Sequence, residues 1–276
     1  MSSENLFKPF GVAHLTIIGL TIALPFVLAL IVRRTKSHVL ERSIAFSISL
    51  LLLINYVVYL FVGRKFGLTV WQRGLPMQLC DWAMGVIIVA LFTGNCRWLE
   101  IAYFWGIGGT LQAIITPNLA FGFPDLRFIS FFVAHSGIII GIVFLMLNYG
   151  FRPSAFGILR TFAWTEVYFV VAFTTDLLAG ENYGFLLHKP EAFSLLSYLS
   201  DWRPLYLAQM HLLAFLFFCA LYAPFAIVDL LRGKGIRKAG KQETPDTLLR
   251  NKTRGNLSVL LFFFLLSCFP DSFFCL

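Results

Sequence analysis

Long apolar runs separated by short polar connections dominate the chain. A helix needs about 20 apolar residues to cross a hydrocarbon core of about 30 Å, and seven segments meet this requirement. They lie near residues 13–32, 44–63, 76–93, 98–116, 127–148, 158–180 and 205–231. The pattern predicts an all-α, polytopic membrane protein whose seven transmembrane helices form one domain over residues 1–235.

The C-terminal part, residues 236–276, departs from this pattern. A basic stretch leads into an apolar run of about ten residues at 257–266, which is short for a membrane span. We interpret the segment as a basic linker with a weakly structured hydrophobic tail. Three alternatives remain open for the run: an interfacial segment, a marginal eighth helix, and an extension of the reading frame without function.

Composition agrees with a membrane protein. The 276 residues are 58% hydrophobic and 13% charged, whereas soluble domains carry about 25% charged residues. This excludes a soluble enzyme, a disordered chain and a disulfide scaffold. The net charge of +8 comes mainly from basic residues between 232 and 254. A basic cluster next to an apolar span is typical of a cytoplasmic flank near anionic lipid, so no nucleic-acid partner is expected.

Basic residues in the connections predict the orientation in the cell membrane. The side predicted to be cytoplasmic carries Arg33, Arg34, Lys36, Arg42, Arg97, Arg152, Arg160 and the cluster after residue 231. The opposite side carries fewer, namely Lys8, Arg64, Lys65, Arg73, Arg127, Lys189 and Arg203. The bias predicts a multi-pass protein with its N-terminus outside and its C-terminus in the cytoplasm.

Polar side chains of the predicted spans gather at one depth. At a rise of 1.5 Å per residue, the outer half of the bilayer contains His14, Cys80, Asp81, Gln112, His135, Asp176 and His211. Glu166 is the main polar exception in the inner half. Ionisable groups in membranes are costly and usually functional, so the clustering predicts a polar cavity open to the outer leaflet. The alternative is that several of these residues simply lie near the interface.

Cys80 and His135 are the candidate reactive pair. Cys80 lies about one turn into the helix expected after Pro76, where the helix dipole favours a thiolate and burial in lipid opposes it. A nearby histidine would accept the thiol proton, as in Cys–His nucleophilic catalysis, and His135 matches in depth. Residue types alone leave the simpler alternative open, which is a structural cysteine and a histidine that bridges helices.

Further polar residues are candidates for the same pocket. Close packing at Gly106, Gly108 and Gly109 would bring Gln112 to the cavity, where its amide could stabilise an oxyanion. The candidate substrate-binding residues are His14, Asp81, Thr116, Asp176, Asn182 and His211. A zinc-like site built from three histidines and Cys80 is a weak alternative, because its ligands come from four helices without short spacing. No metal is therefore predicted.

Several strings of the sequence resemble the YwaF-like family of bacterial integral membrane proteins. They are LPMQLC at 75–80, WGIGGTLQA at 105–113, ITP at 115–117, FFVAH at 131–135, NY at 182–183 and PLY at 204–206. The vertebrate relatives of this family include an acyltransferase that moves arachidonoyl chains onto ether lysophospholipids, using a cysteine active centre and a histidine. More distant relatives are membrane hydrolases of fatty-acid esters. The resemblance implies that Cys80 and His135 hold the cysteine and histidine roles.

The sequence thus predicts a lipid acyltransferase or ester hydrolase that needs no cofactor. Cys80 would attack an acyl carbonyl of a membrane phospholipid or lysolipid, His135 would act as base and then acid, and Gln112 would assist the oxyanion. The alternative is a membrane transporter or receptor that binds a small amphipathic ligand in the same outer-leaflet pocket. The lack of internal inverted repeats disfavours transport, and a structural role also remains open. The oligomeric state is unknown from the sequence.

Overall fold

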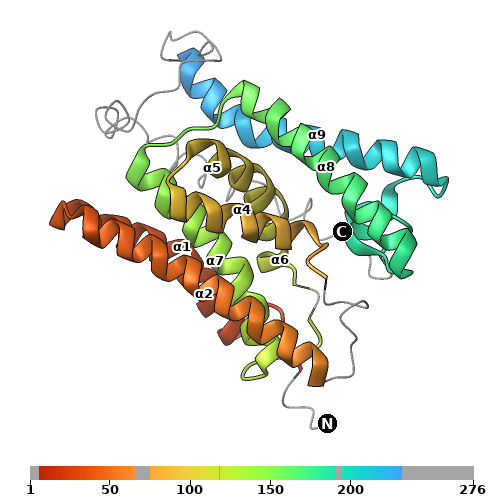
Figure 1. Ribbon diagram of the computed structural model, residues 1–276, viewed down its shortest axis with the longest axis horizontal. Coiled ribbons are helices and arrows are strands. Elements are labelled where there is room, and N and C mark those ends of the chain that lie inside the picture. The colour runs from red at the N-terminus through yellow and green to blue at the C-terminus, as the bar shows by residue number, and fades with distance from the viewer. Residues whose placement is uncertain (1–5, 66–74, 118, 191–193, 232–276) are drawn as a thin grey trace.

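The computed structural model describes residues 6–65, 75–117, 119–190 and 194–231. These residues are mostly helical and form no sheet, although an isolated bridge joins Leu6 to Phe121. The helices are α1 (Val12–Thr35), α2 (His38–Lys65), α4 (Leu79–Thr93), α5 (Cys96–Ala102), η2 (Tyr103–Thr110), α6 (Leu111–Ile115), α7 (Leu126–Tyr149), α8 (Ala155–Ala179), η3 (Tyr183–Phe185), η4 (Leu195–Tyr198) and α9 (Arg203–Leu231) (Figure 1). The predicted tail at 236–276 lies outside the described residues, so the division into two domains stays a prediction.

Five of the described helices, α1, α2, α7, α8 and α9, are long and apolar enough to cross a membrane. The other two predicted spans take a different form. Helix α4 has 15 residues, a length of about 22 Å at the usual helical rise. The stretch at 98–116 consists of α5, η2 and α6, which follow one another without a gap. The structure supports a multi-span membrane protein, while the count of seven crossings stays a prediction.

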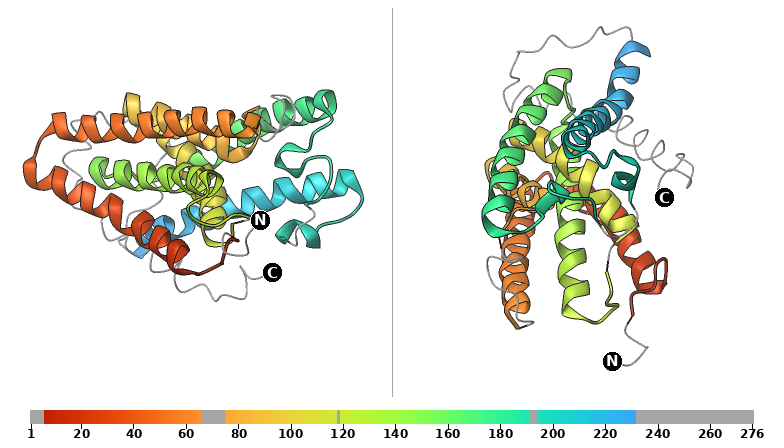
Figure 2. Two further views of the ribbon diagram at one scale, coloured as in Figure 1. Left: turned by 90° about the horizontal axis from the view of Figure 1, so that it is seen from below. Right: turned by 90° about the vertical axis from the view of Figure 1, so that its right-hand side faces the viewer.

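Helix α7 is the centre of the bundle. Of its most apolar stretch, 67% is buried, against 22–28% in the other four long helices. It packs against α1, α2, α4, η2 and α6, and Figure 2 shows it between α1 and α2. Two glycines allow this close packing, since Gly137 faces Leu52 of α2 and Gly141 faces Ile87 and Leu91 of α4.

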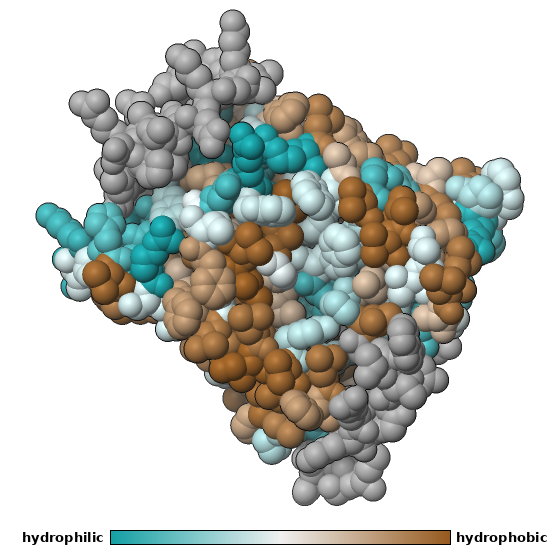
Figure 3. Space-filling view, in the orientation of Figure 1, coloured by the Kyte–Doolittle hydropathy of each residue, from teal (hydrophilic) through white to brown (hydrophobic). Residues whose placement is uncertain are grey.

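The outer surfaces of the surrounding helices are apolar. Exposed residues of α1 and α2 include Leu20, Val27, Leu51 and Ile54. Figure 3 shows a broad hydrophobic surface over these helices, with hydrophilic residues at the end where the two helices join. Apolar side chains on the outside and close packing inside are what a helical bundle surrounded by lipid requires.

The segment η2 joins the two halves of the bundle. Its eight residues are π-helical, and Tyr103 and Trp105 are almost fully buried. The Tyr103 hydroxyl donates to the Leu221 carbonyl of α9 (2.9 Å), and Trp105 Nε1 donates to Thr165 Oγ1 of α8 (2.9 Å). These contacts attach α8 and α9 to the α4–α7 core, at a type of irregularity that is frequent near functional sites.

Three arginines of the predicted cytoplasmic side donate to backbone carbonyls toward the C-terminal ends of other helices. The pairs are Arg33 with Leu147 (2.7 Å), Arg42 with Phe92 (3.2 Å) and Arg152 with Phe225 (3.1 Å). A cation is favourable at this end of a helix because the macrodipole is negative there. Helices α4, α7 and α9 therefore end on the same, basic side of the bundle.

Candidate functional site

The first turn of α4 determines where Cys80 lies. Gln78 is the N-cap residue with extended backbone, and its N–H donates to Asp81 Oδ2 (3.2 Å). This is the reciprocal half of a capping box, in which the third helical residue accepts from the cap. Cys80 is the second helical residue, half-buried and not in a disulfide. The predicted ligand-binding residue Asp81 thus has a defined local role in starting the helix.

Cys80 and His135 lie at the same end of two parallel helices. Gly141 of α7 faces Ile87 of α4, and further along both helices Gly94 lies against Tyr149. Cys80 precedes Ile87 by seven residues and therefore shares its face, about 10 Å nearer the helix start. His135 precedes Gly141 by six residues, about 9 Å nearer the start of α7. The two side chains consequently differ in depth by about one turn or less.

The His135 side chain is turned away from the direct line to α4. Six residues correspond to a rotation of about 120° from the face that carries Gly141, which directs His135 toward the side of α7 that meets η2. Since α4, η2 and α7 all pack against one another, this helical geometry favours positions for both Cys80 and His135 near the three-way junction of these elements. No hydrogen bond joins these two residues in the described part of the chain.

One ring nitrogen of His135 is occupied and the other is available. Nδ1 lies 2.7 Å from the Phe131 carbonyl, and the two rings stack with centroids 4.1 Å apart. A carbonyl only accepts hydrogen bonds, so Nδ1 carries the proton of the neutral ring and Nε2 presents a lone pair. Nε2 has no hydrogen-bond partner among the described residues. This is the tautomer that a general base with a backbone orienting group requires.

His14, predicted to line the pocket, is committed to the fold. The N–H of Phe10 donates to its Nδ1 (2.9 Å), which leaves Nε2 to donate to the Ile114 carbonyl of α6 (2.7 Å). The side chain is 1% exposed and packs against the ring of Phe132 (5.6 Å). It borders a hollow of about 210 Å³ near the N-terminal segment, which Phe7 and Phe128 also line.

Gln112 of α6 and Thr116, the C-cap residue of that helix, are both exposed. The Thr116 hydroxyl donates to the Gln112 carbonyl one turn earlier (3.1 Å). Gly109 is also exposed, and no atom lies within 4 Å of the position that a Cβ would take there. Gln112 is thus separated from the buried junction, and its predicted contact with an oxyanion remains a prediction.

Asp176 and Asn182 organise the loop that follows α8. Asp176 is fully buried, and its Oδ1 accepts from the N–H of Tyr183 (2.6 Å). Asn182 Oδ1 accepts from the N–H groups of Leu187 (2.8 Å) and His188 (3.2 Å). Both residues are predicted to bind substrate. In the structure one oxygen of each accepts hydrogen bonds within this loop, while Asp176 Oδ2 is buried without a hydrogen-bond partner among the described residues.

The same loop reaches the start of α4. The Gly184 N–H donates to Gln78 Oε1 (3.1 Å), and the Tyr168 hydroxyl of α8 donates to the Met77 carbonyl (3.0 Å). Tyr168 is 5% exposed, and its ring lies 5.5 Å from that of Trp82. Two contacts from outside α4 therefore hold the residues that directly precede Cys80.

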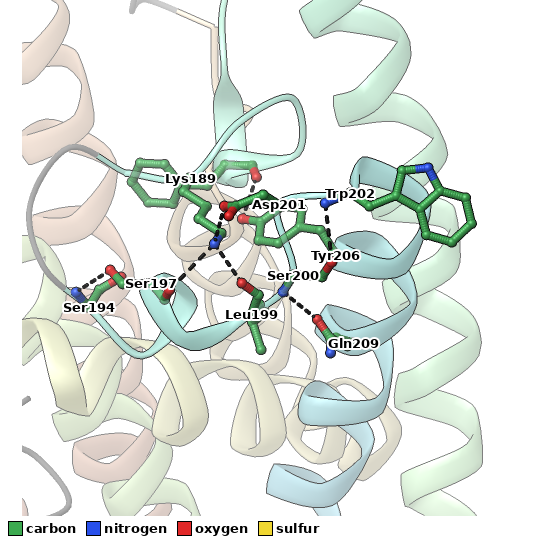
Figure 4. A network of polar contacts seen from close by, with 10 residues as sticks. Lys189, Ser194, Ser197, Leu199, Ser200, Asp201, Trp202, Tyr206 and Gln209 are labelled. Atoms are coloured by element: carbon green, nitrogen blue, oxygen red, sulfur yellow. Dashed lines mark hydrogen bonds and ion pairs between the residues drawn. The ribbon is translucent and has the colours of Figure 1, made fainter.

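The rest of this loop folds around one ammonium group (Figure 4). Lys189 Nζ donates to the Leu199 carbonyl (2.5 Å) and to Asp201 Oδ1 (2.7 Å). Ser200 N–H donates to Gln209 Oε1 of α9 (2.7 Å). The hydrogen bond and charge of Lys189 lower the pKa of the exposed Asp201 carboxyl. Lys189 thus binds the described residues 197–201 of this loop, and Ser200 attaches them to α9.

The model of the TMEM164 family matches residues 9–222 of the chain. This chain belongs to the TMEM164 family. It is a family of membrane proteins, in agreement with the five long apolar helices. A search of curated proteins and of solved structures gave no match. The family match covers α1 to α8 and most of α9, including Cys80 and His135.

In this TMEM164 family member, His211 has a partner that the sequence does not predict. His211 Nδ1 lies 2.6 Å from the Leu207 carbonyl, and Nε2 lies 3.3 Å from Glu166 Oε2 of α8. The side chains of His211 and Glu166 are 26% and 43% exposed. The helical rise places Glu166 in the inner half and His211 in the outer half of the predicted spans, so predicted depth did not indicate this contact.

The polar residues predicted to share one cavity are distributed over separate contacts in the described residues. His14 binds α6, Asp176 binds the loop that follows α8, and His211 binds Glu166. No group of three or more His, Cys, Asp or Glu side chains in these residues is arranged to hold a metal ion. The junction of α4, η2 and α7 is therefore the place where candidate chemistry concentrates.

Proposed function

We propose that this protein is an intramembrane lipid acyltransferase or ester hydrolase that uses Cys80 and His135. One observation carries the proposal. The Nε2 lone pair of His135 is available, and it lies at about the same depth as the free thiol of Cys80. The two residues belong to α7 and α4, which run parallel and pack against each other. Catalytic pairs are often apart in the absence of substrate and approach only in the complex. The three-way junction is where an acyl carbonyl would lie between them.

The chemistry proceeds through an acyl-enzyme. The Cys80 thiol transfers its proton to His135 Nε2 as the sulfur attacks the acyl carbonyl carbon. Collapse of the tetrahedral intermediate breaks the ester C–O bond, and His135 returns the proton to the leaving lipid alkoxide. In the second half, His135 takes a proton from a lysolipid hydroxyl or from water. The new C–O bond forms, the C–S bond breaks, and the thiolate recovers the proton.

A phospholipid or lysolipid substrate follows from two arguments. The candidate pair lies at membrane depth, where an acyl chain can approach laterally from the bilayer. The strings at 75–80, 105–113 and 131–135 also resemble the YwaF-like family and its vertebrate cysteine-centred relatives that act on ether phospholipids.

We also propose that α4 and the continuous α5–η2–α6 segment complete a bundle of seven crossings in the cell membrane. Cys96–Ile115 spans 20 helical residues, about the length that a crossing needs. The arginines that meet the ends of α4, α7 and α9 lie on one side, which favours a cytoplasmic C-terminus and an outside N-terminus.

Acyl transfer from a labelled phospholipid to a lysolipid by the purified protein in nanodiscs tests the proposal. Cys80→Ala and His135→Ala are expected to abolish turnover, and intact-mass spectrometry of the wild type should detect a thioester on Cys80. Cys96→Ala is the matched control, because Cys96 is also a free, half-buried cysteine. Unchanged turnover in Cys80→Ala would reject Cys80 as the nucleophile and with it the proposed mechanism. Lysolipid binding without turnover in the wild type would favour the transporter or receptor.

A further inference from the structure

A buried hydroxyl at the end of η2 has no partner. Thr110 is 1% exposed, and its Oγ1 makes no hydrogen bond in the described part of the protein. A buried hydroxyl without a partner is unfavourable, because its hydrogen bonds to water are lost and not replaced. Such groups are rare in native structures and call for an explanation such as catalysis or an absent ligand.

The backbone directs Thr110 toward α7. Gly106 of η2 lies so close to Ile138 and Ile142 that an added Cβ would overlap with their side chains. A π-helix has close to 4.4 residues per turn, about one more than an α-helix. Thr110, four residues after Gly106, therefore returns to nearly the same face. We therefore expect the hydroxyl to point toward the central helix, α7.

The register of η2 and α6 against α7 places Thr110 near His135. Gly106 is level with Ile138 and Ile142. Further along the chain, in α6, the Ile114 carbonyl binds His14, whose ring packs against Phe132 of α7. The two segments therefore run antiparallel, and Thr110 falls midway, about one turn from the level of His135. Cys80 approaches the same junction from α4.

We propose that Thr110 is a further catalytic residue, whose hydroxyl donates a hydrogen bond to the oxyanion of the tetrahedral intermediate. This deepens the proposed function and rests on it. When the Cys80 sulfur bonds to the carbonyl carbon, the C=O electron pair moves to oxygen, and Thr110 Oγ stabilises that negative charge without giving up its proton. Thr110 fits the task better than Gln112, because an oxyanion donor is most effective in a water-excluded site and Gln112 is exposed.

The chain offers a matched control. Thr161 of α8 is also fully buried, and its hydroxyl also has no partner in the described residues. It lies near the inner end of α8, six residues after Ala155. Thr161→Val and Thr110→Val therefore remove the same group from equally buried positions, of which only one is at the proposed site.

The experiment compares Thr110→Val, Thr110→Ser and Thr161→Val in the acyl-transfer assay. Loss of one oxyanion donor lowers kcat by about 10²–10³-fold, so Thr110→Val should lose that much kcat with little change in KM. Thr110→Ser should retain most activity, Thr161→Val should match the wild type, and neither valine variant should lower the Tm. A kcat of Thr110→Val within about threefold of Thr161→Val would overturn the role of Thr110.

A second readout separates this inference from the acyl-enzyme itself. A phospholipid analogue with a trifluoromethyl ketone in place of the ester carbonyl adds a thiol reversibly, and ¹⁹F NMR detects the adduct. Adduct in the wild type and Thr161→Val, weakened at least tenfold in Thr110→Val, supports the oxyanion role. Equal amounts of adduct in the wild type and both valine variants would exclude the oxyanion role of Thr110 and leave the acyl-enzyme mechanism standing. If the wild type forms no adduct and Cys80→Ala keeps full turnover, the proposed function is rejected.

Discussion

His135 donates its Nδ1 proton to the carbonyl oxygen of Phe131, 2.7 Å away and one turn earlier in α7. The ring of Phe131 also stacks on the imidazole. One residue therefore orients the candidate base through its backbone and its side chain. A base held in this way loses little freedom when the substrate binds.

Replacing Phe131 by Leu should loosen His135 without removing it. The backbone carbonyl stays, while the stacked ring is lost, so we expect kcat for acyl transfer to fall by about tenfold, since small misplacements of catalytic groups are costly. Phe123→Leu, which changes an exposed aromatic residue, is the control and should leave kcat unchanged. Equal kcat values in the two variants would show that the stacking does not position His135.

Tyr168→Phe should disturb the start of α4 and thereby Cys80. The change removes only the hydroxyl that binds the Met77 carbonyl, so the first helical turn loses an outside contact. We expect slower alkylation of Cys80 by a lipid-soluble maleimide, measured in a protein whose other cysteines are replaced by serine. Tyr206→Phe is the control. Tyr206 is as buried as Tyr168, and its hydroxyl binds the Phe185 carbonyl in the loop after α8. The prediction fails if both variants react alike.

Glu166 and His211 should be coupled energetically. Removing one partner leaves a polar group at membrane depth without this polar contact, so Glu166→Gln and His211→Ala should each destabilise the protein. The double variant should lose less than the sum, with a coupling of about 1 kcal/mol, as for other polar pairs in membrane proteins. Unfolding by steric trapping in bicelles measures these free energies, and additive losses would contradict the coupling.

Glu100 should be among the most sensitive positions for stability. Its side chain is buried and accepts from Ser154 N–H and Oγ (both 2.8 Å) and from Arg160. Glu100→Ala leaves these donors without an acceptor and should cost about 3–5 kcal/mol of unfolding free energy. Asp201→Asn, at an exposed ion pair with Lys189, should leave the Tm unchanged. A small loss in Glu100→Ala would mean that water replaces the carboxylate.

The cap of α7 should make a small, pH-dependent contribution to stability. Asp125 Oδ1 accepts from the N–H of Arg127 (2.8 Å), and the Arg127 side chain binds both carboxylate oxygens. Hydrogen bonds from this guanidinium lower the pKa of Asp125. A lowered pKa means that the stabilisation is complete above the ordinary value of about 3.9 and is lost as the pH falls through the folded-state pKa.

Because the Asp125 side chain is partly exposed to solvent (24%), the contribution should stay below about 1 kcal/mol. The difference in Tm between the wild type and Asp125→Asn should therefore be small at pH 7 and vanish in acid. A difference that grows as the pH falls would contradict this sign.

Local composition was sufficient to predict most of the helices. The runs at 13–32, 127–148, 158–180 and 205–231 correspond to α1, α7, α8 and α9 within a few residues. In lipid, a segment can satisfy its backbone groups only by forming a helix, so an apolar run of sufficient length determines its own secondary structure. The common depth of Cys80 and His135 follows from the same arithmetic of helical rise.

The partners of the polar side chains were decided by tertiary structure alone. His14 binds a carbonyl 100 residues away, at Ile114, and His211 binds Glu166 on another helix. The predicted span at 98–116 is likewise divided into the contiguous elements α5, η2 and α6, and this change in helix type occurs where Gly106 packs tightly against α7. Apolar periodicity shows that a helix forms, but hydrogen-bond partners depend on the rotation and register of helices against each other, which no single segment encodes.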